Sequence, residues 1–184
     1  KQAVITSVDR DDLPDKGARH WANTITEIKQ LNPDTTMEVL IPDFDGDPEL
    51  IKMVVDAKPD IISHNLETVR RLTPLVRSRA KYDLSLKVLK TISEAGVVSK
   101  SGIMVGLGET RNEILESMDD LLSVGCAVFT IGQYLQPTQS HLPVEEYVHP
   151  EVFEEYRQIG LSKGFRIVES APLVRSSYHA ERHV

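Results

Sequence analysis

The sequence predicts an α/β fold built on a mostly parallel sheet. Apolar runs of strand length recur along the chain, and several stretches between them place apolar residues at helical spacing. Strands that alternate with helices of this length imply right-handed crossovers, which join parallel strands. With 184 residues and 40% hydrophobic content, the chain is long enough to bury one core. The alternation leaves two architectures open, an open sheet and a barrel.

Each element has its own signal. The first helix is expected at Ala18–Leu31, where apolar residues fall on one stripe. Asp47-Pro48 provides an N-cap and first turn for the next helix, and Tyr82–Ala95 repeats the apolar stripe. Thr110-Arg111-Asn112-Glu113 is a capping box, and Pro150 starts a last helix. The strands are expected at Ala3–Val8, Glu38–Ile41, Ile61–Ser63, Gly102–Leu107, Val128–Leu135 and Phe165–Val168.

Composition narrows the function classes. The formal net charge of -7 argues against broad phosphate-backbone binding, so nucleic acid is not an expected partner. A single cysteine, Cys126, excludes an internal disulfide and is expected to be a buried thiol in a reducing compartment. No stretch is long and apolar enough to span a bilayer, so we expect a cytoplasmic protein that does not enter a membrane. An apolar strand is expected almost at once after Lys1, so we expect the chain to be a truncated one.

Polar groups follow the predicted strands, at the edge where parallel α/β folds bind ligands. Ser7–Asp12 places three carboxylates and an arginine in one loop, which suits a metal, acid–base work or a charge-balanced network. Asn65 and Glu67 follow the third strand and offer hydrogen-bonding groups for a ribose diol. Strand-to-helix loops are polar in any case and supply helix caps, so the series carries more weight than any single residue. His64 is expected to be structural, not a metal ligand.

Two further segments carry specific patterns. Gly102–Glu109 has glycines between a strand and a helix, but no Lys-Ser or Lys-Thr follows, so a nucleoside triphosphate site is not expected. Arg175-Ser176-Ser177-Tyr178 stands near the end of the chain, within a run from Pro172 to Ala180 that has no helical or strand period. The alternative for this run is a solvated tail.

Together, Ser7–Asp12, Gly102–Glu109 and Pro172–Ala180 closely resemble lipoyl synthases, a family of radical S-adenosylmethionine (SAM) enzymes. The resemblance covers essentially the whole chain. It implies a partial (β/α) TIM-type barrel of the radical SAM kind, truncated at its N-terminus and lacking the first strand and cluster loop. On this basis residues 1–184 are expected to form a single domain, with a C-terminal auxiliary-cluster tail at about 165–184.

The same resemblance implies an activity. Members of this family are sulfurtransferases that insert sulfur at C6 and C8 of a protein-bound octanoyl-lysine and so form the lipoyl cofactor. They use SAM and two 4Fe-4S clusters, which are held by cysteine triplets upstream of the region that this chain resembles. The implied partners are an octanoylated lipoyl-carrier domain or glycine-cleavage H protein, and an electron-donor protein. With Cys126 alone, the chain by itself is expected to be inactive.

The resemblance also implies site residues. SAM would be bound by Ser7, Asp9, Arg10, Asn65, Glu67, Gly102, Met104, Gly106 and Glu109. Arg175 and Ser177 are the implied catalytic residues, with Ser177 the metal ligand, an oxygen ligand to the auxiliary cluster that supplies sulfur. Such a ligand has a physical rationale, because an alkoxide is harder than a thiolate and should leave iron more easily as the cluster opens. Two departures from the family pattern are Met104 in place of isoleucine and Ala171 in place of glycine.

One basic segment stands out in this acidic chain. Five basic residues and no acidic one lie between Thr68 and Tyr82, namely Arg70, Arg71, Arg77, Arg79 and Lys81. The segment is interpreted first as a solvated surface. The alternative is a docking surface for an acidic lipoyl-carrier domain, where opposite potentials would speed the encounter.

Two rival functions remain open. One is a (β/α)-barrel lyase or aldolase that uses Lys100 as a Schiff base, although Lys100 is expected before the strand begins, at the wrong end for barrel catalysis. The other is a non-catalytic binding fragment. No Ser/His/Asp constellation is apparent, which disfavours nucleophilic catalysis.

Overall fold

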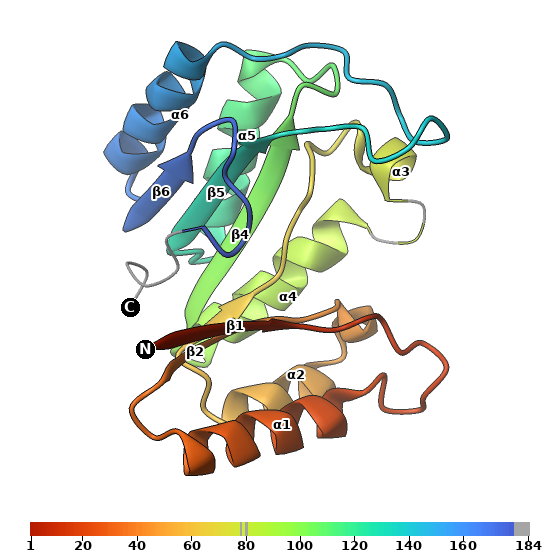
Figure 1. Cartoon of the computed structure of the whole chain (residues 1–184), viewed down its shortest axis with the longest axis vertical. Helices are drawn as coiled ribbons and strands as arrows, with labels where there is room; N and C mark the ends of the chain where they lie inside the picture. The colour runs from red at the N-terminus through yellow and green to blue at the C-terminus, as the bar shows by residue number, and fades with distance from the viewer. Residues whose placement is uncertain (78, 80, 179–184) are drawn as a thin grey trace.

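A parallel β-sheet organises the protein. The computed structural model describes residues 1–77, 79 and 81–178. Within them, six strands pair in sequential order and all neighbours are parallel. They are β1 (Gln2–Thr6), β2 (Thr36–Leu40), β3 (Ile61–Ser63), β4 (Val98–Val105), β5 (Val128–Gln133) and β6 (Ile167–Ser170). Because β1 and β6 do not pair with each other at the two edges of this sheet, the fold is an open, partial (β/α) barrel (Figure 1).

The connections between strands are helical. The helices are α1 (Ala18–Leu31), a 3-10 turn η1 (Phe44–Gly46), α2 (Pro48–Asp56), α3 (Thr73–Val76), α4 (Tyr82–Glu94), α5 (Arg111–Ser123) and α6 (Pro150–Lys163). Figure 1 shows α1 and α2 beneath β1 and β2, while α5 and α6 lie at the other end of the sheet beside β5 and β6. Among the described residues, no helix combines the length and the apolar character needed to cross a membrane.

Local signals explain where several helices begin. Asp47 caps α2 by accepting a hydrogen bond from the Glu49 amide at 2.9 Å, with Pro48 in the first turn. Thr110 and Glu113 form the predicted capping box at the start of α5. These predictions from sequence are confirmed, as are the bounds of α1.

Strand β4 differs from its prediction. It begins at Val98 and not at Gly102. Its first half contains the buried polar residues Ser99, Lys100 and Ser101, so the sequence there has no apolar run that would predict a strand. The expectation that Lys100 precedes the strand is therefore wrong, since it is the third residue of β4. Strand β6 also begins two residues later than expected, at Ile167.

Alternation along the strands separates two faces of the sheet. One face belongs to the apolar cores packed beneath the helices, to which β2 contributes Met37 and Val39, β4 contributes Ile103 and β5 contributes Phe129. The intervening residues point to the inner face of the partial barrel, where Lys100 of β4 is buried beside residues of β2 and of the C-terminal segment. The inner face is thus partly polar, as expected of a site and not of a simple core.

Candidate functional site

Two adjoining cavities lie at the C-terminal edge of the sheet, where α/β barrels carry their sites. Their volumes are about 530 Å³ and about 240 Å³, and Leu40, Asn65 and Glu67 line both. Of the site residues predicted from sequence, the larger cavity is lined by Ser7, Asp9, Asn65 and Glu67, and the smaller by Asn65, Glu67, Gly102, Met104 and Arg175. The remaining four, Arg10, Gly106, Glu109 and Ser177, lie outside both linings.

Asn65 and Glu67 occupy the boundary between the cavities. The Asn65 Nδ2 donates to Glu67 Oε1 at 3.0 Å, and the Glu67 backbone pairs with β4 through Gly102 O and the Met104 amide at 3.0 and 2.8 Å. Asn65 Oδ1 is buried and has no hydrogen-bond partner among the described residues. An orphaned buried acceptor is rare, so this oxygen is suited to accept a hydrogen bond from a ligand hydroxyl.

The backbone beside this oxygen is unusually close to its neighbours. A Cβ on Gly102 would lie 2.4 Å from Thr130 Oγ1 and 3.3 Å from Asn65 Oδ1. Glycine at this strand position therefore lets the Thr130 and Asn65 side chains approach the backbone of β4, which a residue with a Cβ would prevent. Asn65 and Gly102 both line the smaller cavity, where the unpartnered Asn65 Oδ1 fits a ligand that carries hydroxyl groups, as the ribose of SAM does.

The Ser7–Asp12 loop divides between the two sides of β1. Ser7 and Asp9 face the larger cavity. Arg10 instead forms a bidentate pair with Asp12, both contacts at 2.7 Å, and lines a separate cavity beside α1. The pairing raises the pKa of Arg10 and lowers that of Asp12. The structure therefore does not bring Arg10 together with Asp9, as a joint binding site for the aminoacyl end of SAM would require.

Glu109 turns back onto its own loop. Its carboxylate accepts hydrogen bonds from the Gly106 amide at 2.6 Å and the Leu107 amide at 2.9 Å. Gly106 has a φ of 98°, in the left-handed region that favours glycine. The two residues thus set the shape of the glycine loop from outside the cavities.

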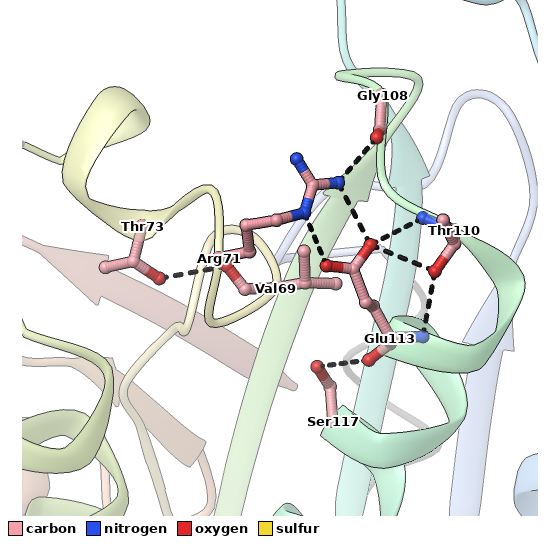
Figure 2. A network of polar contacts seen from close by, with 7 residues as sticks. All are labelled: Val69, Arg71, Thr73, Gly108, Thr110, Glu113 and Ser117. Carbon is pink, nitrogen blue, oxygen red and sulfur yellow. Dashed lines mark hydrogen bonds and ion pairs between the residues drawn. The ribbon is translucent and has the colours of Figure 1, made fainter.

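A second network of polar contacts, centred on Arg71 and Glu113, also holds the glycine loop (Figure 2). The Arg71 guanidinium donates to both carboxylate oxygens of Glu113, at 2.7 and 3.0 Å, and to the Gly108 carbonyl at 2.8 Å. Glu113 Oε2 also accepts from the Thr110 amide at 2.8 Å. The Arg71 hydrogen bond, followed by that of the Thr110 amide, lowers the pKa of Glu113 to about 2. Arg71 therefore joins the β3–α4 connection to the glycine loop and the first turn of α5.

Other arginines of the basic segment are engaged as well. Arg70 pairs with Asp83 and, at 3.1 Å, with Asp120, and its guanidinium lies 4.3 Å from the Tyr82 ring centroid. Arg77 donates to the Asn65 carbonyl at 2.9 Å.

Arg79 pairs with Asp11 at 3.2 Å, while Lys81 occupies the exposed N-cap position of α4. Four of the five cations thus make contacts within the protein, and three of them, Arg70, Arg71 and Arg79, pair with carboxylates. These three ion pairs leave less unpaired charge for a docking surface than the sequence suggests.

The C-terminal segment 171–178 lies against the inner face of the sheet. Pro172 O accepts from the Gln133 amide at 3.2 Å, and Val174 is buried. Arg175 and Ser176 line the smaller cavity, while Ser177 is exposed. The end of the predicted tail, residues 179–184, lies outside the described residues. Sequence reasoning missed Gly132, whose missing side chain admits this segment, because a Cβ there would be 2.3 Å from Val174 O.

Three buried reactive groups take structural roles. His64 bonds Ile41 O at 3.0 Å and Ser85 Oγ at 2.9 Å, and burial lowers its pKa to about 4, which keeps it neutral. Burial raises the pKa of the Cys126 thiol to about 12. Lys100 is fully buried against Glu38, which does not suit a Schiff-base lysine that must meet a substrate. Among the described residues, no three His, Cys, Asp or Glu side chains gather as a metal site.

Comparisons with known proteins agree with this geometry. A family model described as the Radical SAM superfamily matches residues 1–121. The chain is 70% identical over 182 residues to the lipoyl synthase of Phocaeicola vulgatus, which covers 99% of this chain and 64% of that protein. It is 68% identical over 184 residues to the lipoyl synthase of Parabacteroides distasonis, covering 100% of this chain and 66% of that protein. The chain thus spans slightly less than two thirds of the length of these relatives.

Solved structures show the same fold at low sequence identity. A methylornithine synthase superimposes with a TM-score of 0.69 at 13% identity, over 95% of this chain and 58% of that one. The Streptococcus suis protein SuiB bound to S-adenosylmethionine gives 0.69 at 10% identity, over 97% and 41% of the two chains.

Proposed function

Because the chain belongs to the radical SAM superfamily, we propose that it forms the larger part of an enzyme that inserts sulfur into a protein-bound octanoyl group to make the lipoyl cofactor. The observation that carries the proposal is the composition of the smaller cavity. It is lined both by Asn65, Glu67, Gly102 and Met104 and by Arg175 and Ser176 of the C-terminal motif. A cofactor held by the first group would meet the motif directly.

Each part of the cavities has a proposed task toward SAM. Asn65 Oδ1 accepts a hydrogen bond from one ribose hydroxyl, and the neighbouring Glu67 carboxylate accepts one from the second ribose hydroxyl. Gly102 and Met104 form the surface beside the adenine. Ser7 and Asp9 face the larger cavity, where Asp9 suits the ammonium of the aminoacyl end. Arg10, Gly106 and Glu109 act on loop shape instead of touching the cofactor.

SAM and a reduced 4Fe-4S cluster, when bound, supply a 5'-deoxyadenosyl radical for hydrogen abstraction at C6 and C8, and a second cluster supplies sulfur. The thiolates for both clusters would come from the part of the relatives' length that this chain does not span. This chain's own contribution is to orient the reactants and to exclude water from the cavity between Met104 and Arg175. Ser177 is proposed as the oxygen ligand of the second cluster.

The proposed partners are an octanoylated lipoyl-carrier domain or H protein and an electron donor. Docking of an acidic carrier on the basic segment has little support, because Arg70, Arg71, Arg77 and Arg79 are engaged within the protein. Lys81 remains a candidate contact.

The test is Ser177→Ala in the complete enzyme, with 5'-deoxyadenosine release and lipoyl product measured in the same reaction. Radical generation should persist while lipoyl formation fails, because the SAM site and the sheet are untouched. Ser162→Ala, on the exposed face of α6, is the matched control and should leave both products at the parent rate. Lipoyl formation at the parent rate in Ser177→Ala would exclude this serine as the ligand, and joint loss of both products would indicate a structural role.

A further inference from the structure

A fully buried ion pair crosses the inner face of the sheet. Lys100 Nζ lies 2.8 Å from Glu38 Oε1 and 3.0 Å from Oε2, and both side chains are 0% exposed. Ser63 Oγ donates to Glu38 Oε1 at 2.6 Å. Glu38, Ser63 and Lys100 lie on the neighbouring strands β2, β3 and β4. Since desolvation offsets much of the attraction in a buried pair, stability alone is a weak reason for two charges here.

The same ammonium reaches a third acceptor. Lys100 Nζ donates to the backbone carbonyl of Ser176 in the C-terminal segment. An ammonium has three tetrahedral N–H donors, and the contact with the Glu38 carboxylate restricts how they can rotate. Glu38, itself held by Ser63, therefore orients the donor that meets Ser176.

This contact reaches the part of the segment that lies beyond its anchors on β5. Pro172 and Val174 are anchored there, through the Gln133 amide and the space above Gly132. Beyond Val174, the Tyr178 amide bonds Arg175 O at 2.9 Å, which closes a turn within the segment. Lys100 ties that turn to the sheet.

The chemistry of the peptide bond makes the tie specific. A peptide unit is planar, so a carbonyl held at Ser176 also fixes the amide of Ser177 and the direction in which the Ser177 Cα leaves it. Charge-assisted hydrogen bonds are stronger than neutral ones, and this one joins a buried ammonium to a partly buried carbonyl. The peptide group that precedes Ser177 is thereby held in one orientation.

We propose that Lys100, aimed by Glu38 and Ser63, is a positioning residue that holds the Ser176–Ser177 peptide so that the Ser177 hydroxyl is presented as a ligand. The mechanical tie stands on the contacts above, and its use in sulfur insertion rests on the proposed function. Lys100, which the aldolase alternative treated as a Schiff-base nucleophile, acts in this proposal by binding a backbone carbonyl.

The test uses the complete enzyme with Glu38→Leu and Lys100→Met together, which removes the tie and both charges of the pair at once. Amide hydrogen exchange in residues 174–178 should rise about tenfold or more, while β4 and β5 stay protected, because the backbone bonds between the strands remain. The ratio of lipoyl product to 5'-deoxyadenosine should fall at least about tenfold, as expected when an anchoring hydrogen bond is lost. The control is Asp119→Ala with Lys163→Met, which removes an exposed pair between α5 and α6 and should change neither readout.

A second variant protects the test against misfolding. In Glu38→Gln with Lys100→Gln, two neutral amides replace the pair, and the shorter side chain no longer reaches Ser176; the same two changes are expected. Parent-like exchange in residues 174–178, or an unchanged product ratio, overturns the proposal. If the parent enzyme makes no lipoyl product at all, the proposed function fails, while the exchange measurement still decides whether Lys100 holds the segment.

Discussion

Gly106→Ala is expected to be among the most damaging single-methyl additions to this protein. Gly106 follows β4 and opens the glycine loop, with its amide bonded to Glu109 Oε1 at 2.6 Å and its φ at 98°. A Cβ there would lie 2.3 Å from Gln133 Nε2 and 2.4 Å from the Glu146 carbonyl oxygen. The change therefore combines a strained backbone with a collision against another segment.

The expected loss has two parts. Placing a residue with a Cβ in the left-handed region costs about 1–2 kcal/mol. Overpacking against neighbours that cannot move freely costs about 1–3 kcal/mol more. The neighbours here are constrained, because Gln133 Nε2 itself donates to Glu146 O at 2.9 Å and to Tyr134 O at 3.0 Å. The free energy of unfolding should thus fall by about 2–5 kcal/mol, the sum of these two terms.

Gly96→Ala separates the two parts. Gly96 also has a positive φ, 79°, but no described heavy atom lies within 4 Å of the added Cβ. Urea unfolding of both variants, followed by far-ultraviolet circular dichroism, should place Gly106→Ala below Gly96→Ala by about 1–3 kcal/mol, the overpacking term alone. Equal losses in the two variants would refute the close approach of the glycine loop to the segment that holds Glu146.

Two further predictions address the loops around the cavities. Arg71→Ala should raise the pKa of Glu113 from about 2 toward its ordinary value of 4.5, as followed by NMR titration. A depressed pKa of the Glu113 carboxyl stabilises the folded state above pH 4.5, and this contribution is lost as the pH falls through about 2. The variant lacks much of this contribution and should therefore unfold in acid at a higher pH than the parent. Superimposable Glu113 titration curves of variant and parent would contradict the network. Glu67→Ala in the complete enzyme should weaken SAM binding about tenfold by calorimetry, the cost of one unsatisfied hydroxyl. Exposed Glu27→Ala is its control, and parent affinity in Glu67→Ala would exclude Glu67 from the site.

Helix boundaries were predictable because their signals are local. Ala18–Leu31 matches its prediction at both ends, and the Thr110–Glu113 capping box is present in full. Each depends on residues within a few positions of one another. Strand β4 was harder, because its first four residues include Lys100, which resembles a loop residue until its partner is known. That partner, Glu38, stands 62 positions earlier, and no pattern in the sequence joins the two.

The candidate site was predictable to the extent that topology determines it. The carboxyl ends of neighbouring parallel strands meet at one edge, so Asn65, Gly102 and Met104 could be expected together, and they line one cavity. Orientation within a loop does not follow from topology. Arg10 pairs with Asp12 and turns to the α1 side, although its neighbour Asp9 faces the larger cavity.

Three cations share one function that the sequence did not reveal. Arg77 donates to the Asn65 carbonyl, Arg71 to the Gly108 carbonyl and Lys100 to the Ser176 carbonyl. In each case the acceptor is the backbone of a segment beside the cavities. A side-chain cation on a backbone carbonyl fixes the loop and leaves the loop's own side chains available to a ligand. Arg71 and Arg77 of the basic segment therefore support the site from within the protein, and Lys100 makes the same kind of contact in the interior of the sheet.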